Sequence, residues 1–211
     1  MKGHTVPRAF SELTFTPTVR AHQERMGSAK TYAKFIEGGP QQGHLIGEPE
    51  KQFIQARDGF YQSSVSETGW PYVQYRGGPV GFLKVLGPQT IGYADFSGNK
   101  QYISRGNLDG NDRVAMILMD YANQHRLKIL GRVEFTEGQA AAASLYPEGS
   151  EAPAERAAII RVEALDWNCP RHITPRFTEA ELRPHLNSLG QQMAQLQAEN
   201  ERLKQELSKL S

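Results

Sequence analysis

Cysteine is almost absent from the sequence: its 211 residues include only Cys169. One thiol excludes an internal disulfide and a cysteine-based zinc site within a single chain, a composition typical of reducing compartments. No base can be placed beside Cys169 in its Trp-Asn-Cys-Pro segment, so a small buried residue is favoured over a nucleophile.

The sequence also lacks an excess of either charge and any long apolar run. Its 24 basic and 23 acidic residues give a net charge of +1, so the overall charge points to neither nucleic acid nor an anionic membrane as a partner. No stretch approaches the roughly 18 apolar residues of a membrane span, and the N-terminus has no signal-peptide core. We therefore expect a cytoplasmic protein that binds neither nucleic acid nor membrane.

Common catalytic motifs are missing as well. The sequence contains no Gly-x-Ser-x-Gly and no His-Glu-x-x-His, and its six histidines show no paired spacing. Neither common glycine-rich nucleotide loop follows a predicted strand. No metal site is expected, and the catalytic residues stay unknown.

The middle of the chain is rich in strand-like segments, at residues 60–66, 71–76, 81–86, 90–95, 114–120, 127–136 and 157–167. Between residues 60 and 95 the strands follow one another without helices, which favours a curled meander or barrel over a doubly wound α/β sheet. Helices are predicted at the edges, at residues 20–37, 48–57 and 138–147. The fold class is mainly β with peripheral helices (α+β).

A long polar segment separates Asp95 from the strand that resumes at Arg113. Loops of this length usually have a function or are disordered. The regular hydrogen-bonding side chains of this one favour a function.

The C-terminal tail has a helical pattern with a heptad repeat. Thr178 and Glu181 fit a capping box for a short helix that Pro184 should end, and Ser188 begins a second helix. Apolar residues then alternate at spacings of four and three: Leu189, Met193, Leu196, Asn200, Leu203, Leu207 and Leu210.

This repeat predicts self-association of the tail. Asn200 occupies an a position, where asparagine fixes register and favours parallel dimers, and Glu199 and Lys204 could pair between chains. The alternative is one amphipathic helix docked on its own barrel.

Cations and hydroxyl or amide donors gather near strand ends, at Arg76, Lys84, Ser104, Arg105, Asn107, His125, Arg126 and Arg132. A phosphate dianion binds about two cations together with hydroxyl or amide donors. Gly77 and its neighbouring glycine would let the backbone approach a ligand closely. Each cation alone would be a solvated surface charge, but the cluster favours an anion site.

Three segments, 71–86, 94–108 and 126–135, resemble the pyridoxamine 5′-phosphate oxidase-like, FMN-binding split-barrel superfamily. The similarity runs from about Glu50 to Trp167. It implies a six-stranded split barrel, an obligate homodimer and two FMN molecules in clefts between the subunits. The implied domains are an extension at 1–47, the FMN-binding split barrel at 48–177 and the coiled-coil-like tail at 178–211.

The resemblance also implies roles for individual residues. Arg76 and Lys84 would face the FMN phosphate, with Gly77 beside them. Ser104 would contact that phosphate with Asn107 close by. Arg126 would approach the flavin from the pairing edge of the barrel.

Two further residues, Trp167 and Arg176, resemble a tryptophan and an arginine that the oxidase sends to the neighbouring subunit's flavin, with a spacing one residue shorter. Ser104 replaces a lysine of the oxidase's phosphate loop, and the Tyr…Arg…Ser set that binds pyridoxine phosphate is not recognisable in residues 144–156. The missing set favours FMN binding over vitamin B6 chemistry, whereas Ser104 in place of the lysine implies weaker binding of the FMN phosphate.

The sequence therefore predicts an FMN-dependent oxidoreductase that acts on a small organic molecule. One alternative is a flavin- or haem-binding protein without turnover. The other is a dimeric assembly protein that uses its C-terminal coiled coil.

Overall fold

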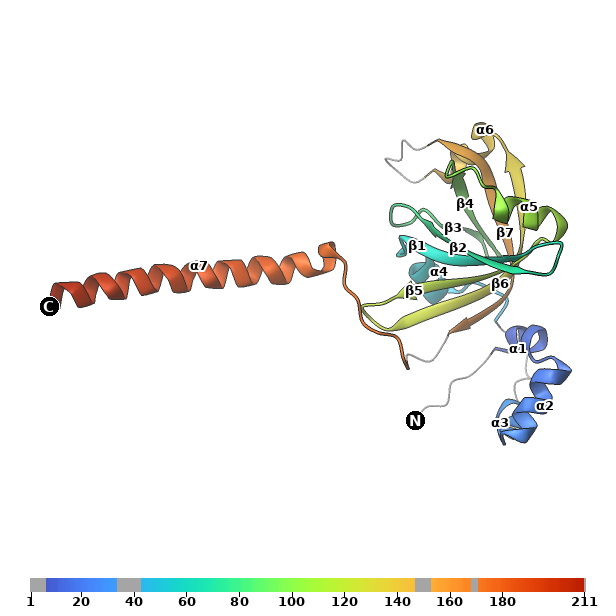
Figure 1. Ribbon diagram of the computed structural model, residues 1–211, viewed down its shortest axis with the longest axis horizontal. Coiled ribbons are helices and arrows are strands. Elements are labelled where there is room, and N and C mark those ends of the chain that lie inside the picture. Colours follow the sequence, from blue (N-terminus) through green and yellow to red (C-terminus); the bar gives the residue numbers. More distant parts are fainter. Residues whose placement is uncertain (1–6, 34–42, 147–152, 168–170, 211) are drawn as a thin grey trace. The chain divides into compact units, whose positions relative to one another are not determined.

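The computed structural model describes residues 7–33, 43–146, 153–167 and 171–210 (Figure 1). It divides into two compact units. One comprises the chain up to Asp120 together with residues 124–173, and the other comprises residues 121–123 and 174–211. Cys169, residues 34–37 of the first predicted helix and residues 147–152 lie outside the described part.

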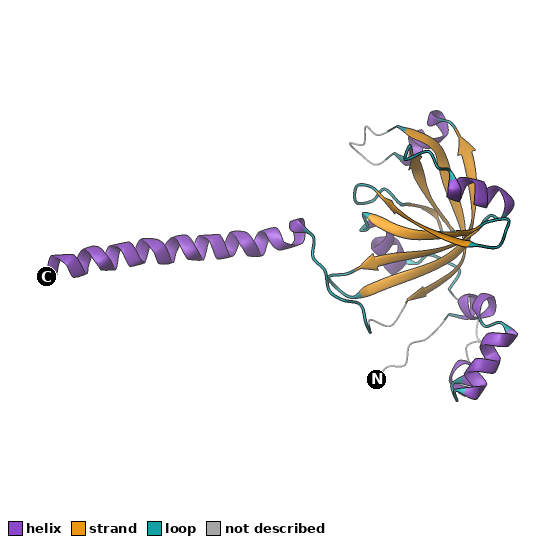
Figure 2. Cartoon of the chain, viewed as in Figure 1, coloured by secondary structure: helices purple, strands orange, loops and turns teal. Residues whose placement is uncertain are grey.

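The first unit is built on an antiparallel sheet, whose strands are orange in Figure 2. Its strand order is β2-β1-β5-β6-β7-β4-β3. Its strands are β1 (Gly59–Val65), β2 (Pro71–Gly77), β3 (Lys84–Gly87), β4 (Thr90–Phe96), β5 (Arg113–Asp120), β6 (His125–Glu137) and β7 (Ala154–Trp167). The described sheet thus has seven strands, where the resemblance implied six. The predicted mainly β fold with helices at its edges is confirmed.

The long β6–β7 hairpin joins the two halves of the sheet. The first part of β6 pairs with β5, the first part of β7 pairs with β4, and β6 and β7 pair with each other from Leu127 to Glu137. Their register shifts between Leu130 and Gly131, and such bulges bend a strand and increase its twist. The hairpin can therefore curl the whole sheet.

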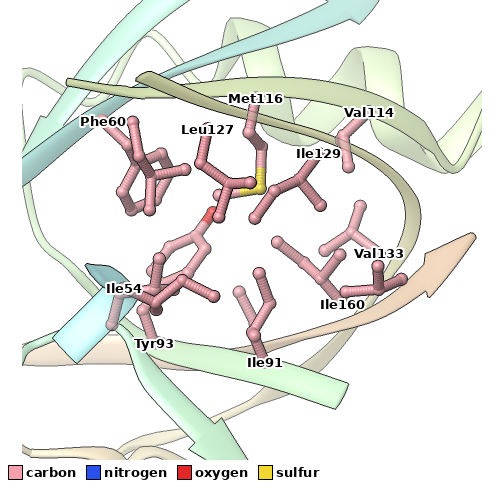
Figure 3. Packing of buried hydrophobic residues seen from close by; sticks show 14 of the residues in the cluster. Ile54, Phe60, Ile91, Tyr93, Val114, Met116, Leu127, Ile129, Val133 and Ile160 are labelled. Atoms are coloured by element: carbon pink, nitrogen blue, oxygen red, sulfur yellow. The ribbon is translucent and has the colours of Figure 1, made fainter. Parts of the chain in front are cut away.

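The concave face of this curled sheet encloses the main core (Figure 3). Alternate residues of β5 are buried, beginning at Val114, and β6 continues the same face with Leu127 and Ile129. An alternation of buried and exposed residues is expected where one face of a sheet is packed and the other is solvated. Ile54 of α4 (Glu48–Gln55) completes the core and is fully buried.

The two ends of the sheet meet through side chains. Tyr93 of β4 donates a 3.1 Å hydrogen bond to Oε1 of Gln62 on β1, and its ring lies 5.4 Å from that of Phe60. Arg76 of β2 forms an ion pair with Asp95 of β4. Because β2 is an edge of the sheet and β4 lies beside the other edge, these contacts close the curl without backbone pairing.

Short helices surround the sheet, and three of them precede α4. They are α1 (Arg8–Thr14), α2 (Pro17–Arg25) and α3 (Ala29–Ala33). Gly27 has a φ of 75° and separates α2 from α3, so the predicted helix at 20–37 is broken there. After β6 come α6 (Gln139–Ala142) and the 3₁₀ turn η1 (Ala143–Leu145).

The sequence predicted a loop for the whole polar segment after Asp95. This prediction is wrong in part, because the segment contains helix α5 (Ile103–Gly110). Two glycines and an asparagine lower the helix propensity of this stretch. Leu108 is buried in the main core and anchors the helix on the sheet.

The second unit contains α7 (Glu179–Leu210), one unbroken helix (Figure 1). The predicted capping box is confirmed: the Thr178 N–H donates to Oε2 of Glu181 at 2.7 Å, and the Glu181 N–H donates to Oγ1 of Thr178 at 3.2 Å. The predicted break at Pro184 is wrong, and Ser188 lies inside the helix. Pro184 lies so near the N-terminus that its missing N–H removes only one early hydrogen bond.

We predict that Gly131→Ala destabilises the first unit. A Cβ at this position would lie 2.6 Å from the Arg161 carbonyl oxygen and 2.9 Å from Cγ2 of Ile160, so the bulge would have to shift, at a cost of about 1–3 kcal/mol. Thermal or urea unfolding measures the loss. Gly106→Ala is the control, because a Cβ at that position would have no neighbour within 4 Å and alanine favours a helix by up to about 1 kcal/mol. Equal stability of the two variants would contradict the prediction.

Candidate functional site

A polar cleft of about 240 Å³ lies where β2, the end of β4, the start of β7 and α5 come together. We call it the Arg76 cleft. Its walls include Gln74, Arg76, Asp95, Ser104, Glu155, Arg156 and the segment 98–102. A neighbouring cavity of about 160 Å³ shares Arg76 and Asp95 and is also lined by Gly77.

Two arginines in this cleft share one carboxylate. Asp95 forms an ion pair with Arg76, and its Oδ2 lies 3.5 Å from Nε of Arg156. Asp95 and Arg156 are directly paired residues of β4 and β7. All three side chains are largely buried, with 7% of Arg156 and 13% of each of the others exposed.

The Nε atoms of Arg76 and Arg156 are buried and have no hydrogen-bond partner. A buried N–H without a partner is rare in proteins and is expensive to maintain. Burial by itself would lower the pKa of Arg76, but Tyr93 and Asp95 outweigh it and raise that pKa above its ordinary value. The guanidinium thus keeps its charge and can donate to an anion.

The ring of Tyr93 lies directly behind this ion pair, 5.2 Å from the Arg76 guanidinium carbon. Tyr93 is almost completely buried, and this burial raises the pKa of its phenol to about 12. Its hydroxyl therefore stays protonated and continues to donate to Gln62 at neutral pH.

Helix α5 forms one wall of the cleft and is held to the sheet by side-chain hydrogen bonds. The buried Ser104 donates from Oγ to Oε1 of Gln74 at 2.8 Å. One turn later, Asn107 donates from Nδ2 to Oγ of Ser64 at 3.0 Å. Asn107 itself lines a different pocket, together with Gly106 and Gly110.

The segment that leads into α5 has two residues in the left-handed region, Lys100 with a φ of 60° and Tyr102 with a φ of 53°. Non-glycine residues adopt this region rarely, and they concentrate at functional sites. The Tyr102 hydroxyl donates to Oε1 of Glu155 at 3.3 Å. The pKa of Glu155 is lowered, mainly by a hydrogen bond from Ser97 and to a smaller extent by its contacts with Arg156.

The ionisable residues of the cleft have a positive balance. Four cations line it, Arg76, Lys100, Arg105 and Arg156, against the two carboxylates Asp95 and Glu155. Arg105 is already paired with Asp109 and, at 3.1 Å, with Glu137. Without Arg105, three cations face two carboxylates on the cleft lining, and this excess favours an anionic ligand.

The structure brings together some of the sequence-predicted site residues. Arg76 and Ser104 line the cleft, and Gly77 lines the adjoining cavity. A Cβ on Gly77 would lie 2.9 Å from the Tyr75 ring, so packing alone already requires glycine there.

Other predicted residues lie elsewhere within the described chain. Lys84 begins β3 and its Nζ lies 3.5 Å from the Gly81 carbonyl oxygen. Trp167 donates from Nε1 to Oε1 of Glu50 at 2.6 Å. Arg126, on β6, has a buried Nε without a hydrogen-bond partner. None of these three lines the Arg76 cleft.

Arg176 belongs to the second unit, where its guanidinium lies 5.0 Å from the Tyr121 ring centre.

Sequence reasoning missed Arg156, Asp95 and Gln74. The available signal was Arg156 itself, a charged residue directly before the apolar run 157–160 of β7.

Comparison of the sequence with protein-family models matches residues 47–169 to the family described as pyridoxamine 5′-phosphate oxidase. This chain belongs to that family. The predicted membership is thereby confirmed. None of the curated proteins matches the sequence significantly.

Several solved structures are similar to this one. A variant of HupZ from group A Streptococcus is 18% identical, with a TM-score of 0.48, over 58% of this chain and 99% of the other. A protein of the pyridoxinephosphate oxidase family from Clostridium acetobutylicum is 14% identical, with a TM-score of 0.43, over 64% and 94%. An FMN-binding protein from Syntrophomonas wolfei is 10% identical, with a TM-score of 0.44, over 69% and 97%.

The described residues contain no group of three or more His, Cys, Asp or Glu side chains placed to hold a metal ion. No helix among them has the length and apolar character needed to cross a membrane.

We predict that Tyr93 makes the fold sensitive to alkaline pH. Above about pH 10 the unfolded chain ionises this phenol, whereas the folded protein keeps it neutral until about pH 12. Stability should therefore fall between these values, by about 2–3 kcal/mol from this residue. Between pH 9 and 11.5 the free energy of unfolding, measured with denaturant, should fall less steeply with pH for Tyr93→Phe than for wild type. Equal slopes for wild type and Tyr93→Phe would contradict the assignment.

Proposed function

We propose that this protein is an FMN-binding flavoprotein, and that it uses FMN to oxidise or reduce a small organic molecule. Family membership supports a flavin, and the Arg76 cleft supports a phosphate-bearing one. The observation that carries the proposal is the buried guanidinium Nε of Arg76, which has no hydrogen-bond partner.

The residues of the cleft fit a phosphate dianion. Arg76 would donate its free N–H to a phosphate oxygen, and a charge-assisted hydrogen bond of this kind is about twice as strong as a neutral one. The Ser104 hydroxyl on the same wall can rotate toward the ligand. Arg76, Arg156 and Lys100 would attract the phosphate, whereas Arg105 is engaged by Asp109 and Glu137.

The bound cofactor would supply hydride or electron transfer, and the protein would supply binding, orientation and charge near the ring. Arg76, Ser104 and Gly77 would hold the phosphate end. We further propose Lys84, Asn107, Arg126, Trp167 and Arg176 as residues that contact FMN from the same or the neighbouring subunit. No residue is assigned a catalytic role.

We also propose a homodimer built on the sheet. An exposed row of side chains crosses β2, β1 and β5, where Tyr75, Tyr61 and Ile117 are direct cross-strand neighbours. Their exposed fractions are 56%, 39% and 38%, and Val73 on the same strand face as Tyr75 is 60% exposed. A continuous apolar surface of this kind is typical of an interface with another protein.

Two alternatives keep the same fold. A haem- or flavin-binding protein without turnover would also use a cationic cleft, and an assembly protein would need only its interfaces. The visible spectrum of protein purified without added cofactor separates them. We expect flavin absorbance, whereas a Soret band would indicate haem, and a colourless protein that does not bind FMN would favour assembly.

We predict that Arg76→Ala weakens FMN binding by about 1.5–3 kcal/mol, or roughly ten- to a hundredfold in Kd, because it removes a largely buried cation beside the phosphate. Quenching of FMN fluorescence measures the Kd. Arg161→Ala is the matched control, since that arginine is 64% exposed and lies on β7 outside the cleft. Circular dichroism checks that both variants fold.

Lys84→Ala belongs in the same titration. A similar loss would support the phosphate role that the resemblance implies for Lys84, although it does not line the Arg76 cleft. Unchanged affinity in both the Arg76 and the Lys84 variants would refute the phosphate assignment.

We predict that pyridoxamine 5′-phosphate is oxidised very slowly or not at all. The residues expected to hold its phosphate are not recognisable in the sequence from 144 to 156. The test is oxygen-dependent formation of pyridoxal 5′-phosphate by the FMN-loaded protein, with a known oxidase as positive control. Turnover at about 1 per second or faster, an ordinary enzyme rate, would show that this region has been misread.

A further inference from the structure

Helix α7 carries a longer apolar seam than the sequence pattern indicated. Because the helix continues through Pro184, the alternating spacing of four and three begins at Leu182. We call the following residues the α7 seam: Leu182, Leu186, Leu189, Met193, Leu196, Asn200, Leu203 and Leu207. In the sequence Leu210 continues the spacing. The seam therefore covers about four heptads, or roughly 42 Å of helix.

The seam is exposed in the described chain: its apolar members are between 39% and 71% exposed. A helix in water gains most of its stability from packing an apolar face, and a row of leucines along 32 residues is an apolar surface of the kind that marks an interface. Pro184 falls on an f position, opposite the seam, where it does not obstruct a partner.

We propose that the α7 seam pairs with the α7 seam of a second copy of this chain, in parallel and in register, as a two-stranded coiled coil. This proposal does not rest on FMN binding.

The first argument for this partner is the position of Asn200. In a parallel, in-register pair each a residue faces the same residue of the other chain. Two asparagine side chains are self-complementary, because each has both a donor and an acceptor. A shift in register would bury the amide against leucine without a hydrogen bond, which is costly.

The second argument is the charge on the flanking positions. The e positions carry Arg183 and Lys204 and no acid, whereas the g positions carry Glu199 and Glu206 and no lysine or arginine. A parallel pair sets each g position opposite the following e position of the partner, so Glu199 of one chain faces Lys204 of the other.

An antiparallel pair would set g opposite g and e opposite e, and would bring only like charges together. Within one chain, Glu199 and Glu206 each lie 3.9 Å from Arg202, and such exposed pairs are weak. These weak pairs within one chain leave Glu199 and Glu206 available to a partner helix.

The test is disulfide trapping in the full chain, with Cys169→Ser in every variant. Leu189→Cys and Leu203→Cys place a thiol at d positions about 21 Å apart along the helix. Ala198→Cys, at an f position between them, is the matched control. After mild oxidation, cross-linked dimer is measured on a denaturing gel without reductant. Circular dichroism confirms that the variants are helical.

We expect each d variant to form on the order of tenfold more cross-linked dimer than the control, because only paired d positions fall within disulfide distance. If neither d variant cross-links more than the control, the proposal is overturned and the helix is docked on its own chain. Cross-linking of only one, or of Leu189→Cys with Leu203→Cys in a mixture, would overturn the parallel, in-register arrangement.

A second measurement uses Asn200→Leu, with Ala198→Leu as its control. A buried asparagine specifies register at a cost in stability, so the first variant should melt about 4 °C or more above the control and form assemblies of mixed size in light scattering. If neither its melting temperature nor its mass changes, Asn200 is exposed to solvent and the seam is unpaired.

Discussion

Closure of the curled sheet by side chains, rather than by backbone pairing, is the constraint on which the first unit depends. Its strand order leaves β2 at one edge and places β4 next to the other, and the gap is bridged by Tyr93 with Gln62 and by Arg76 with Asp95. Desolvating charges is expensive unless the pair is well made, and loss of one member leaves an uncompensated buried charge. The polar bridge therefore tolerates the loss of a single side chain less well than an apolar closure of similar size would.

The bridge and the candidate site are the same residues. Arg76 closes the sheet with one part of its guanidinium and leaves its buried Nε without a partner. Arg156, on the other side of Asp95, has its Nε 3.5 Å from Oδ2 of that residue. A phosphate that accepted a hydrogen bond from Nε of Arg76 would satisfy a donor that the protein leaves unsatisfied. Ligand binding and stability of the first unit are therefore linked, because a ligand that binds only the folded chain stabilises it.

The sequence predicted the strands well and the helices less well, for physical reasons. Alternating apolar residues in β5 and β6 reflect burial on one face, which local pattern records directly. Helix α5 contains two glycines, and its anchoring contacts, such as Leu108 in the core and Ser104 on Gln74, come from distant strands. The continuity of α7 was missed because proline usually ends a helix, but near the first turn it removes only one hydrogen bond.

The site was predictable where the resemblance supplied positions, as at Arg76 and Ser104. Arg156 was missed because its relation to Asp95 arises from pairing between β4 and β7, residues far apart in the chain. A one-dimensional pattern holds no information about that register.

The two proposed interfaces restrict one another through symmetry. A dimer of identical chains has a two-fold axis, and each patch on that axis must be self-complementary. The row formed by Tyr75, Tyr61 and Ile117 and the α7 seam are separate patches of one chain, in different units. If both two-folds coincide, the tail reinforces the dimer made by the sheet. If they do not, each tail joins a different dimer and the chain forms larger assemblies. The segment between Ile173 and Glu179, which has no regular secondary structure, is then the element whose conformation decides between a closed dimer and an open chain of dimers.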